Sequence, residues 1–173
     1  MCMDEFTARL KKADDLAELH QRVGFTLWQL QTLEEVAAQY FVLSTQATNG
    51  MGEIAGNALL SKARKSTFGG TIAKMAKSGV LDEKLHSKLL EILDQRNWLV
   101  HRSLNDSYYA LQDYGALLKL VTRIENIARE AMVLMKNIAS LAEVFVKDRG
   151  ISSMEIDRMT KELLDEWATS DAY

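Results

Sequence analysis

Residues 117–145 read LLKLVTRIENIAREAMVLMKNIASLAEVF, and this stretch decides the fold class. Its apolar residues alternate at spacings of four and three, and a second apolar stripe recurs every seven residues beside the first. The first stripe contains Leu117, Val121, Ile124, Ala128, Ala131, Met135, Ile138, Ala142 and Phe145, and the second contains Leu120, Ile127, Leu134 and Leu141. This pattern predicts an amphipathic helix whose apolar face must be covered by other helices.

We predict that this helix extends from about Tyr108 to Asp148. It would then be about 60 Å long at a rise of 1.5 Å per residue. Because a small bundle does not cover a helix of that length throughout, we expect part of it to pack on a second copy of the chain.

A shorter helix is predicted at the C-terminal end. Arg149-Gly150 is expected to end the long helix. Ser152 and Glu155 then have the spacing of a capping box, which predicts a final helix from about Ser153 to Ala168. The last twenty residues carry six acidic and two basic side chains, so we expect 153–173 to be a peripheral, solvated element.

The first half of the chain predicts one more long helix and several short ones. Apolar residues recur at helical spacing from Asp4 to about Thr48. Glycine-containing turns separate shorter helices over 53–65 and 71–78, and Asp82 has the position of an N-cap for the next helix. The chain contains no proline, the strongest helix breaker. We therefore predict a single all-α domain, residues 1–173, built as an antiparallel helical bundle with a long penultimate helix and short extra helices.

The composition excludes several classes of protein. The net charge of −3 gives no overall field that would attract nucleic acid. Cys2 is the only cysteine, so neither a disulfide framework nor a cysteine-based zinc site is expected. Glu83 and His86 form one Glu-x-x-His step, whereas a di-iron bundle needs two such steps and further carboxylates. We expect no metal and no cofactor. The sequence shows no export signal, lipidation motif or long apolar run, so we expect a cytoplasmic protein with no membrane contact.

Residues 96–101 read RNWLVH and set polar groups into an apolar run, with Arg102 directly after them. Arg96 continues a row of apolar residues that would face the core, where an unpaired polar group is costly. Arg96 and His101 are five residues apart, about 140° around a straight helix. They can converge only if the helix ends or distorts near Val100, or if two protomers each contribute one of them. The row contains Leu85, Leu89, Ile92 and Leu99.

A converging Arg96 and His101 would suit phosphoryl transfer without a metal. Histidine titrates near pH 6.5 and can take a proton from a ribose 2′-hydroxyl. The arginine fork matches the charge that develops on the phosphate oxygens. Because only RNA supplies that internal nucleophile, these residues point to RNA as substrate.

The order Arg, polar residue, three further residues and His, in an all-α chain with a long helix after it, resembles the HEPN superfamily (higher eukaryotes and prokaryotes nucleotide-binding). Its members are helical bundles that often dimerise, and many are metal-independent endoribonucleases of toxin–antitoxin, phage-defence and RNA-processing systems. The resemblance covers about 25–145. It implies that Arg96 and His101 are the catalytic pair and that Asn97 positions them, and we assign Arg102 to substrate binding. The expected partners are a second copy of the chain, RNA, and a cognate antitoxin or regulatory protein.

A noncatalytic reading stays open beside this one. HEPN toxins that pair with a nucleotidyltransferase antitoxin carry a tyrosine two positions after the histidine, where this chain has Ser103. Several members of the superfamily are regulators or scaffolds. In that case Arg96 would pair with Glu34 or Glu35, Asn97 would bond a loop backbone, and His101 would cap the helix C-terminus. The protein would then be a helical interaction or regulatory module.

A basic strip precedes the 96–101 motif. Residues 54–81 include five basic and no acidic side chains: Lys62, Arg64, Lys65, Lys74 and Lys77. Such a strip either holds an RNA backbone, with salt-dependent affinity, or is simply a solvated face.

Overall fold

The computed structural model describes residues 3–170, and over this range the chain forms seven helices and no strand. The all-α prediction is thereby confirmed. The helices are α1 (Met3–Thr45), α2 (Gly52–Ala63), α3 (Phe68–Lys77), α4 (Glu83–His101), α5 (Ser103–Ala110), α6 (Tyr114–Lys147) and α7 (Ser153–Ser170). None of these described helices is both long enough and apolar enough to cross a membrane.

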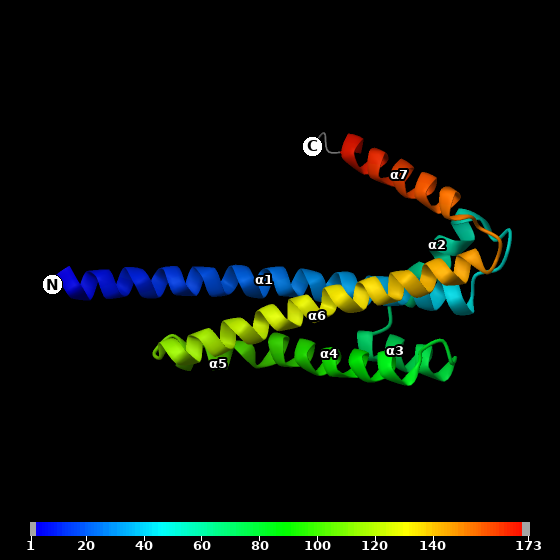
Figure 1. Ribbon diagram of the computed structural model, residues 1–173. Coiled ribbons are helices and arrows are strands. Elements are labelled where there is room, and N and C mark those ends of the chain that lie inside the picture. The colour runs from blue at the N-terminus through cyan, green and yellow to red at the C-terminus, as the bar shows by residue number, and fades with distance from the viewer. Residues whose placement is uncertain (1–2, 171–173) are drawn as a thin grey trace.

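Three long helices form the body of the molecule. α1 and α6 lie side by side and run in the same direction, and α4 runs in the opposite direction beside them (Figure 1). Thr26 of α1 meets Ile124 of α6, and Arg123 of α6 meets Gln95 of α4. Successive long helices are therefore antiparallel, as the sequence predicts, and the first and third are parallel as a consequence.

The core forms where these helices meet. On α6, residues of both apolar stripes are buried, which confirms that other helices cover this face. α1 and α4 face it with apolar rows of their own, and α3 closes one end of the core. The fully covered side chains include Leu30 and Leu33 of α1, Ile72 and Met75 of α3, Leu89 and Ile92 of α4, and Ile124 and Ile138 of α6.

The predicted helix from Tyr108 to Asp148 is wrong at its N-terminal end, because the chain turns between Ala110 and Tyr114 and forms two helices. Asp113 leaves the helical conformation, with φ −137° and ψ 119°. Its carboxylate accepts a hydrogen bond from the backbone N–H of Ala116 at 2.6 Å and caps α6. Similarly, α3 begins three residues earlier than predicted, because the Thr67 hydroxyl caps it by accepting from the N–H of Gly70.

The helix ends with a predicted cap or stop are confirmed at Asp82, Gly150 and Ser152, whereas α1 ends at Thr45, before the predicted Thr48, and α2 ends at Ala63, before the predicted residue 65. Asp82 accepts from the N–H of Leu85 at 2.7 Å and caps α4. Gly150 takes a φ of +90° just after α6, and the Ser152 hydroxyl accepts from the N–H of Glu155 at 3.2 Å. α7 then turns back and points away from the bundle (Figure 1). Of its described side chains, only that of Ile156 is partly buried.

Candidate functional site

The last two turns of α4 carry the predicted site residues. The apolar row below them is buried, so this part of α4 is firmly packed. α4 continues through Val100 and ends at His101, where Arg102 leaves the helix with φ −126° while its N–H still bonds to the Trp98 carbonyl at 2.8 Å. The helix therefore neither ends nor distorts between Arg96 and His101, and within one chain the two residues lie on different faces.

Arg96 lies against α1. Its Nε donates to Oε1 of Glu34 at 3.1 Å, and its Nη1 lies 3.5 Å from Oδ1 of Asn97. The side chains of Arg96 and Glu34 are 33% and 29% exposed, so solvent still reaches the pair. The prediction that Arg96 leans toward the buried side of α4 holds, and Glu34, one of the two carboxylates considered from the sequence, is its partner.

His101 has a different environment. Its side chain is exposed, and in the described part of the chain it makes no hydrogen bond or ion pair. It lies in the last turn of α4, where a positive charge is favoured by the helix dipole. Arg102 and Asn97 are exposed as well. The imidazole is thus available to a ligand.

Trp98, at the centre of the motif, is a structural residue. Its ring is buried, and its indole N–H donates to Oδ2 of Asp106 in α5 at 2.9 Å. The guanidinium of Arg123 in α6 stacks on the ring at 3.4 Å and donates to the Gln95 side chain. Trp98 therefore joins α4, α5 and α6. Sequence reasoning missed this cluster, because Asp106 and Arg123 come from other helices at no fixed spacing from Trp98.

Two members of the predicted basic strip are engaged within the chain. Arg64 forms a two-pronged pair with Glu35 of α1, with Nε 2.8 Å from Oε2. This hydrogen bonding lowers the pKa of Glu35, while partial burial opposes the shift. Lys74 donates to the Ser66 hydroxyl at 2.6 Å. The strip is therefore in part a set of internal contacts and not a continuous free cationic surface.

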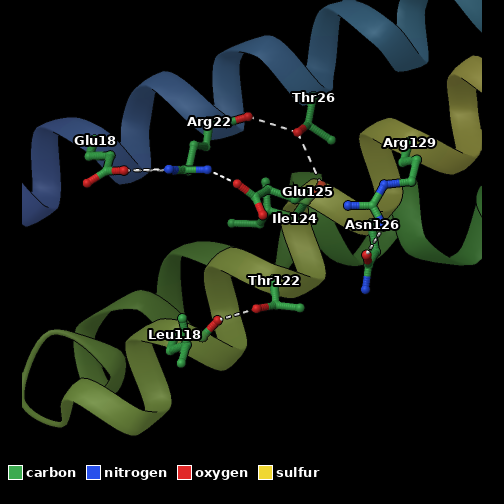
Figure 2. A network of polar contacts seen from close by, with 9 residues as sticks. All are labelled: Glu18, Arg22, Thr26, Leu118, Thr122, Ile124, Glu125, Asn126 and Arg129. Atoms are coloured by element: carbon green, nitrogen blue, oxygen red, sulfur yellow. Dashed lines mark hydrogen bonds and ion pairs between the residues drawn. The ribbon is translucent and has the colours of Figure 1, made fainter.

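A further polar network fixes α1 against α6 (Figure 2). The Arg22 guanidinium bridges Glu18 on its own helix, at 2.5 Å, and Glu125 on α6. The buried Thr26 hydroxyl lies 2.8 Å from the Arg22 carbonyl and 3.3 Å from the Ile124 carbonyl. These contacts border a cavity of about 520 Å³ between the helices. Sequence reasoning missed this network, which sets how α1 and α6 align.

A second groove, of about 620 Å³, runs between α4 and α6. Gln95 and Arg123 line it together with Leu118 and Lys119. It therefore borders the Trp98 cluster through Gln95 and Arg123.

Comparisons with protein families, with curated proteins and with solved structures found no match for this chain. Within residues 3–170 no group of three or more His, Cys, Asp or Glu side chains is placed to hold a metal ion. The residues of α4 and their surroundings are therefore the basis for assigning a function.

Proposed function

We propose that the protein is a metal-independent endoribonuclease of HEPN type, with Arg96, Asn97 and His101 as its catalytic residues. The observation that carries the proposal is the exposed His101, which has no hydrogen-bond or ion-pair partner within residues 3–170, on the same helix as a solvent-accessible Arg96. The motif that these residues form and the helical bundle around it both suit such an enzyme. A cytoplasmic toxin or phage-defence role, with a cognate antitoxin or regulatory partner, belongs to the same proposal.

The reaction would use the ribose of the RNA as its nucleophile. His101 accepts the 2′-hydroxyl proton while the 2′-oxygen attacks phosphorus, and the bond to the 5′-oxygen of the next nucleotide breaks. The leaving 5′-oxygen takes up a proton from water, and a 2′,3′-cyclic phosphate remains. Arg96 stabilises the charge on the phosphate oxygens in the transition state, and Asn97 holds the guanidinium.

The site would be shared between two protomers. Arg96 and His101 lie about 140° apart on a straight α4, so one chain does not direct both at the same phosphate. A two-fold arrangement brings Arg96 of one copy to His101 of the other. This agrees with the homodimer predicted from the sequence and gives each dimer two equivalent sites.

The direct test is cleavage of single-stranded RNA by the purified protein in EDTA. We expect products with cyclic phosphate ends, and we expect His101→Ala to abolish cleavage without changing the helical circular dichroism. His20→Ala is the matched control, because His20 is also exposed but lies on α1. Cleavage that persists in His101→Ala at the wild-type rate would refute the assignment.

A mixing experiment tests the shared site. Arg96→Ala and His101→Ala should each be inactive alone. After the two are unfolded and refolded together, mixed dimers contain one intact site, and we expect about a quarter of the wild-type activity to return. If both residues acted from the same chain, no activity would return.

The Arg96–Glu34 pair favours a second candidate function, a noncatalytic helical interaction or regulatory protein. In that case Arg96 serves to hold α4 against α1. This candidate predicts that the wild-type protein leaves RNA intact in the cleavage assay and that Arg96→Ala lowers stability. The nuclease assay separates the two functions, because some loss of stability in Arg96→Ala is expected from its pair with Glu34 in either case.

A further inference from the structure

Three tyrosines are strongly exposed on the helix–turn–helix that follows the candidate site. Tyr108, Tyr109 and Tyr114 are 64%, 76% and 72% exposed. Tyr40 of α1, in contrast, is buried in the core. Tyrosine rings normally bury much of their apolar area, so three exposed rings in one short segment suggest a surface that meets a ligand.

The local fold explains why these rings face solvent. α5 packs through the small side chains of Ser107 and Ala110, which are both buried. The neighbouring residues Tyr108 and Tyr109 therefore lie on its outer faces. A tight turn follows, in which the N–H of Gln112 bonds to the Tyr109 carbonyl at 3.1 Å, and α6 then begins with Tyr114. The backbone thus keeps the three rings at one end of the molecule.

Cations accompany the tyrosines. Lys11 of α1 places its ammonium 5.6 Å from the centre of the Tyr114 ring, and Arg102 is exposed between α4 and α5. The acidic residues of this segment, Asp106 and Asp113, accept hydrogen bonds from the Trp98 indole and from the N-terminus of α6. Both carboxylates are therefore engaged within the chain, and the exposed side chains around them are Tyr108, Tyr109, Tyr114 and Arg102, together with the neutral Leu104, Asn105 and Gln112.

We propose that Tyr108, Tyr109 and Tyr114 form a stacking platform for the unpaired bases of single-stranded RNA, with Arg102 and Lys11 facing its phosphates. Aromatic rings stack on every base, and nearby cations follow the backbone, which is how proteins hold single strands without reading their sequence. The platform deepens the proposed function and rests on it. His101 lies two residues before α5 and seven before Tyr108, so the platform directly follows the catalytic residue along the chain.

Binding is measured in a His101→Ala background, where the RNA stays intact. The probe is a short fluorescein-labelled single-stranded RNA of mixed sequence, and the readout is fluorescence anisotropy. We expect Tyr109→Ala, and likewise Tyr108→Ala and Tyr114→Ala, to weaken binding roughly tenfold each, whereas the corresponding Phe variants keep the affinity. The same RNA annealed to its complement should bind more weakly, because paired bases are not free to stack.

Two control variants test whether the loss of RNA affinity is specific to the tyrosine platform. Trp28→Ala removes a ring that is 72% exposed on α1, away from the platform, and should leave the affinity unchanged. Arg102→Ala should weaken binding and also reduce its dependence on salt concentration, as expected of a phosphate contact.

The outcomes separate the platform from the nuclease. If the tyrosine variants bind RNA as well as the parent does, or if the parent binds no RNA, the platform is refuted. If the tyrosine variants bind RNA normally but no longer self-associate in sedimentation, the tyrosines contact a second copy of the chain. The platform is then refuted as well. Tyrosine-dependent binding by a wild-type protein that leaves RNA uncut would keep the platform and refute the nuclease.

Discussion

At the scale of single residues, Arg96 shows how a charge is accommodated in an apolar row. Its row is buried at Leu89, Ile92 and Leu99, yet Glu34 and solvent both reach the guanidinium. From the sequence alone Arg96 would be fully buried, and breaking its pair would then cost about 3 to 5 kcal/mol. The exposure of about a third for both partners implies a much smaller effect, because water screens the pair.

We therefore expect a double-mutant cycle of Arg96→Ala and Glu34→Ala to give a coupling energy of about 0.5 to 1 kcal/mol. Urea unfolding measures it, and added salt should reduce it. Substituting Gln31, an exposed neighbour of Glu34 one turn earlier on α1, gives a control cycle with no coupling. A coupling energy near zero for Arg96 and Glu34 would argue against the second candidate function, in which Arg96 holds α4 against α1.

Glu35 gives a prediction about pH. Hydrogen bonds from Arg64 hold the pKa of Glu35 below its ordinary value of 4.5. Because the folded-state pKa is the lower one, the pair adds stability above the unfolded value, and this contribution is lost as the pH falls through the lowered pKa. We expect Arg64→Gln to lower the melting temperature slightly at neutral pH and to have no effect in acid below the pKa of Glu35.

Thermal scans across this pH range provide the measurement, with Lys65→Gln as the control for loss of an exposed cation nearby. An equal loss of stability at neutral and acidic pH would mean that Arg64 acts through packing and not through the Glu35 charge.

The candidate site was predictable from the sequence only in its local part. The helix period correctly placed Arg96 on the buried side, and it showed that His101 points elsewhere. The partners of Trp98 were not predictable, because Asp106 of α5 and Arg123 of α6 reach it from helices whose packing the period does not define. The exposure of Tyr108, Tyr109 and Tyr114 could not be predicted either, because it also depends on how the helices pack.

At the scale of elements, several helix ends with a local chemical signal were predicted correctly. The side-chain caps Asp82 and Ser152 and the left-handed Gly150 lie where the sequence placed them, whereas the Thr67 cap of α3 was missed. The start of α6 was missed, because apolar residues continue at helical spacing through the turn before Asp113. A cap can therefore end a helix even where the hydrophobic pattern continues.

The role of the Asp113 cap in starting α6 can be tested by substitution. We expect Asp113→Ala to cost about 1 kcal/mol in unfolding free energy, because the N–H of Ala116 loses its acceptor, and Asp113→Asn to keep most of the stability. Urea denaturation compares the two variants. If Asp113→Ala is as stable as the wild type, the turn between α5 and α6 is fixed by packing and not by the cap.

At the scale of the whole molecule, the main core supports a body formed by α1, α4 and α6, while the first turns of α1 and helix α7 lie outside it. Residues 5–14 of α1 are exposed and extend beyond the start of α6 (Figure 1). The all-α class and the succession of antiparallel long helices followed from apolar periodicity alone. Which side chains stay uncovered could not be predicted, because exposure depends on the angles at which the helices cross.

The position of α7 outside the core predicts how the molecule responds to the loss of this helix. We expect a chain ending at Gly150 to keep its melting temperature, because among the described side chains of α7 only Ile156 is partly buried and little apolar area is lost. Ile138→Ala in the full chain is the comparison. This residue is fully buried, and its truncation should cost about 2 to 5 kcal/mol and several degrees. Ile156 borders a groove of about 520 Å³ between α1 and α6. If the shortened chain loses as much stability as Ile138→Ala, then α7 lies in that groove in solution, and the groove belongs to the core.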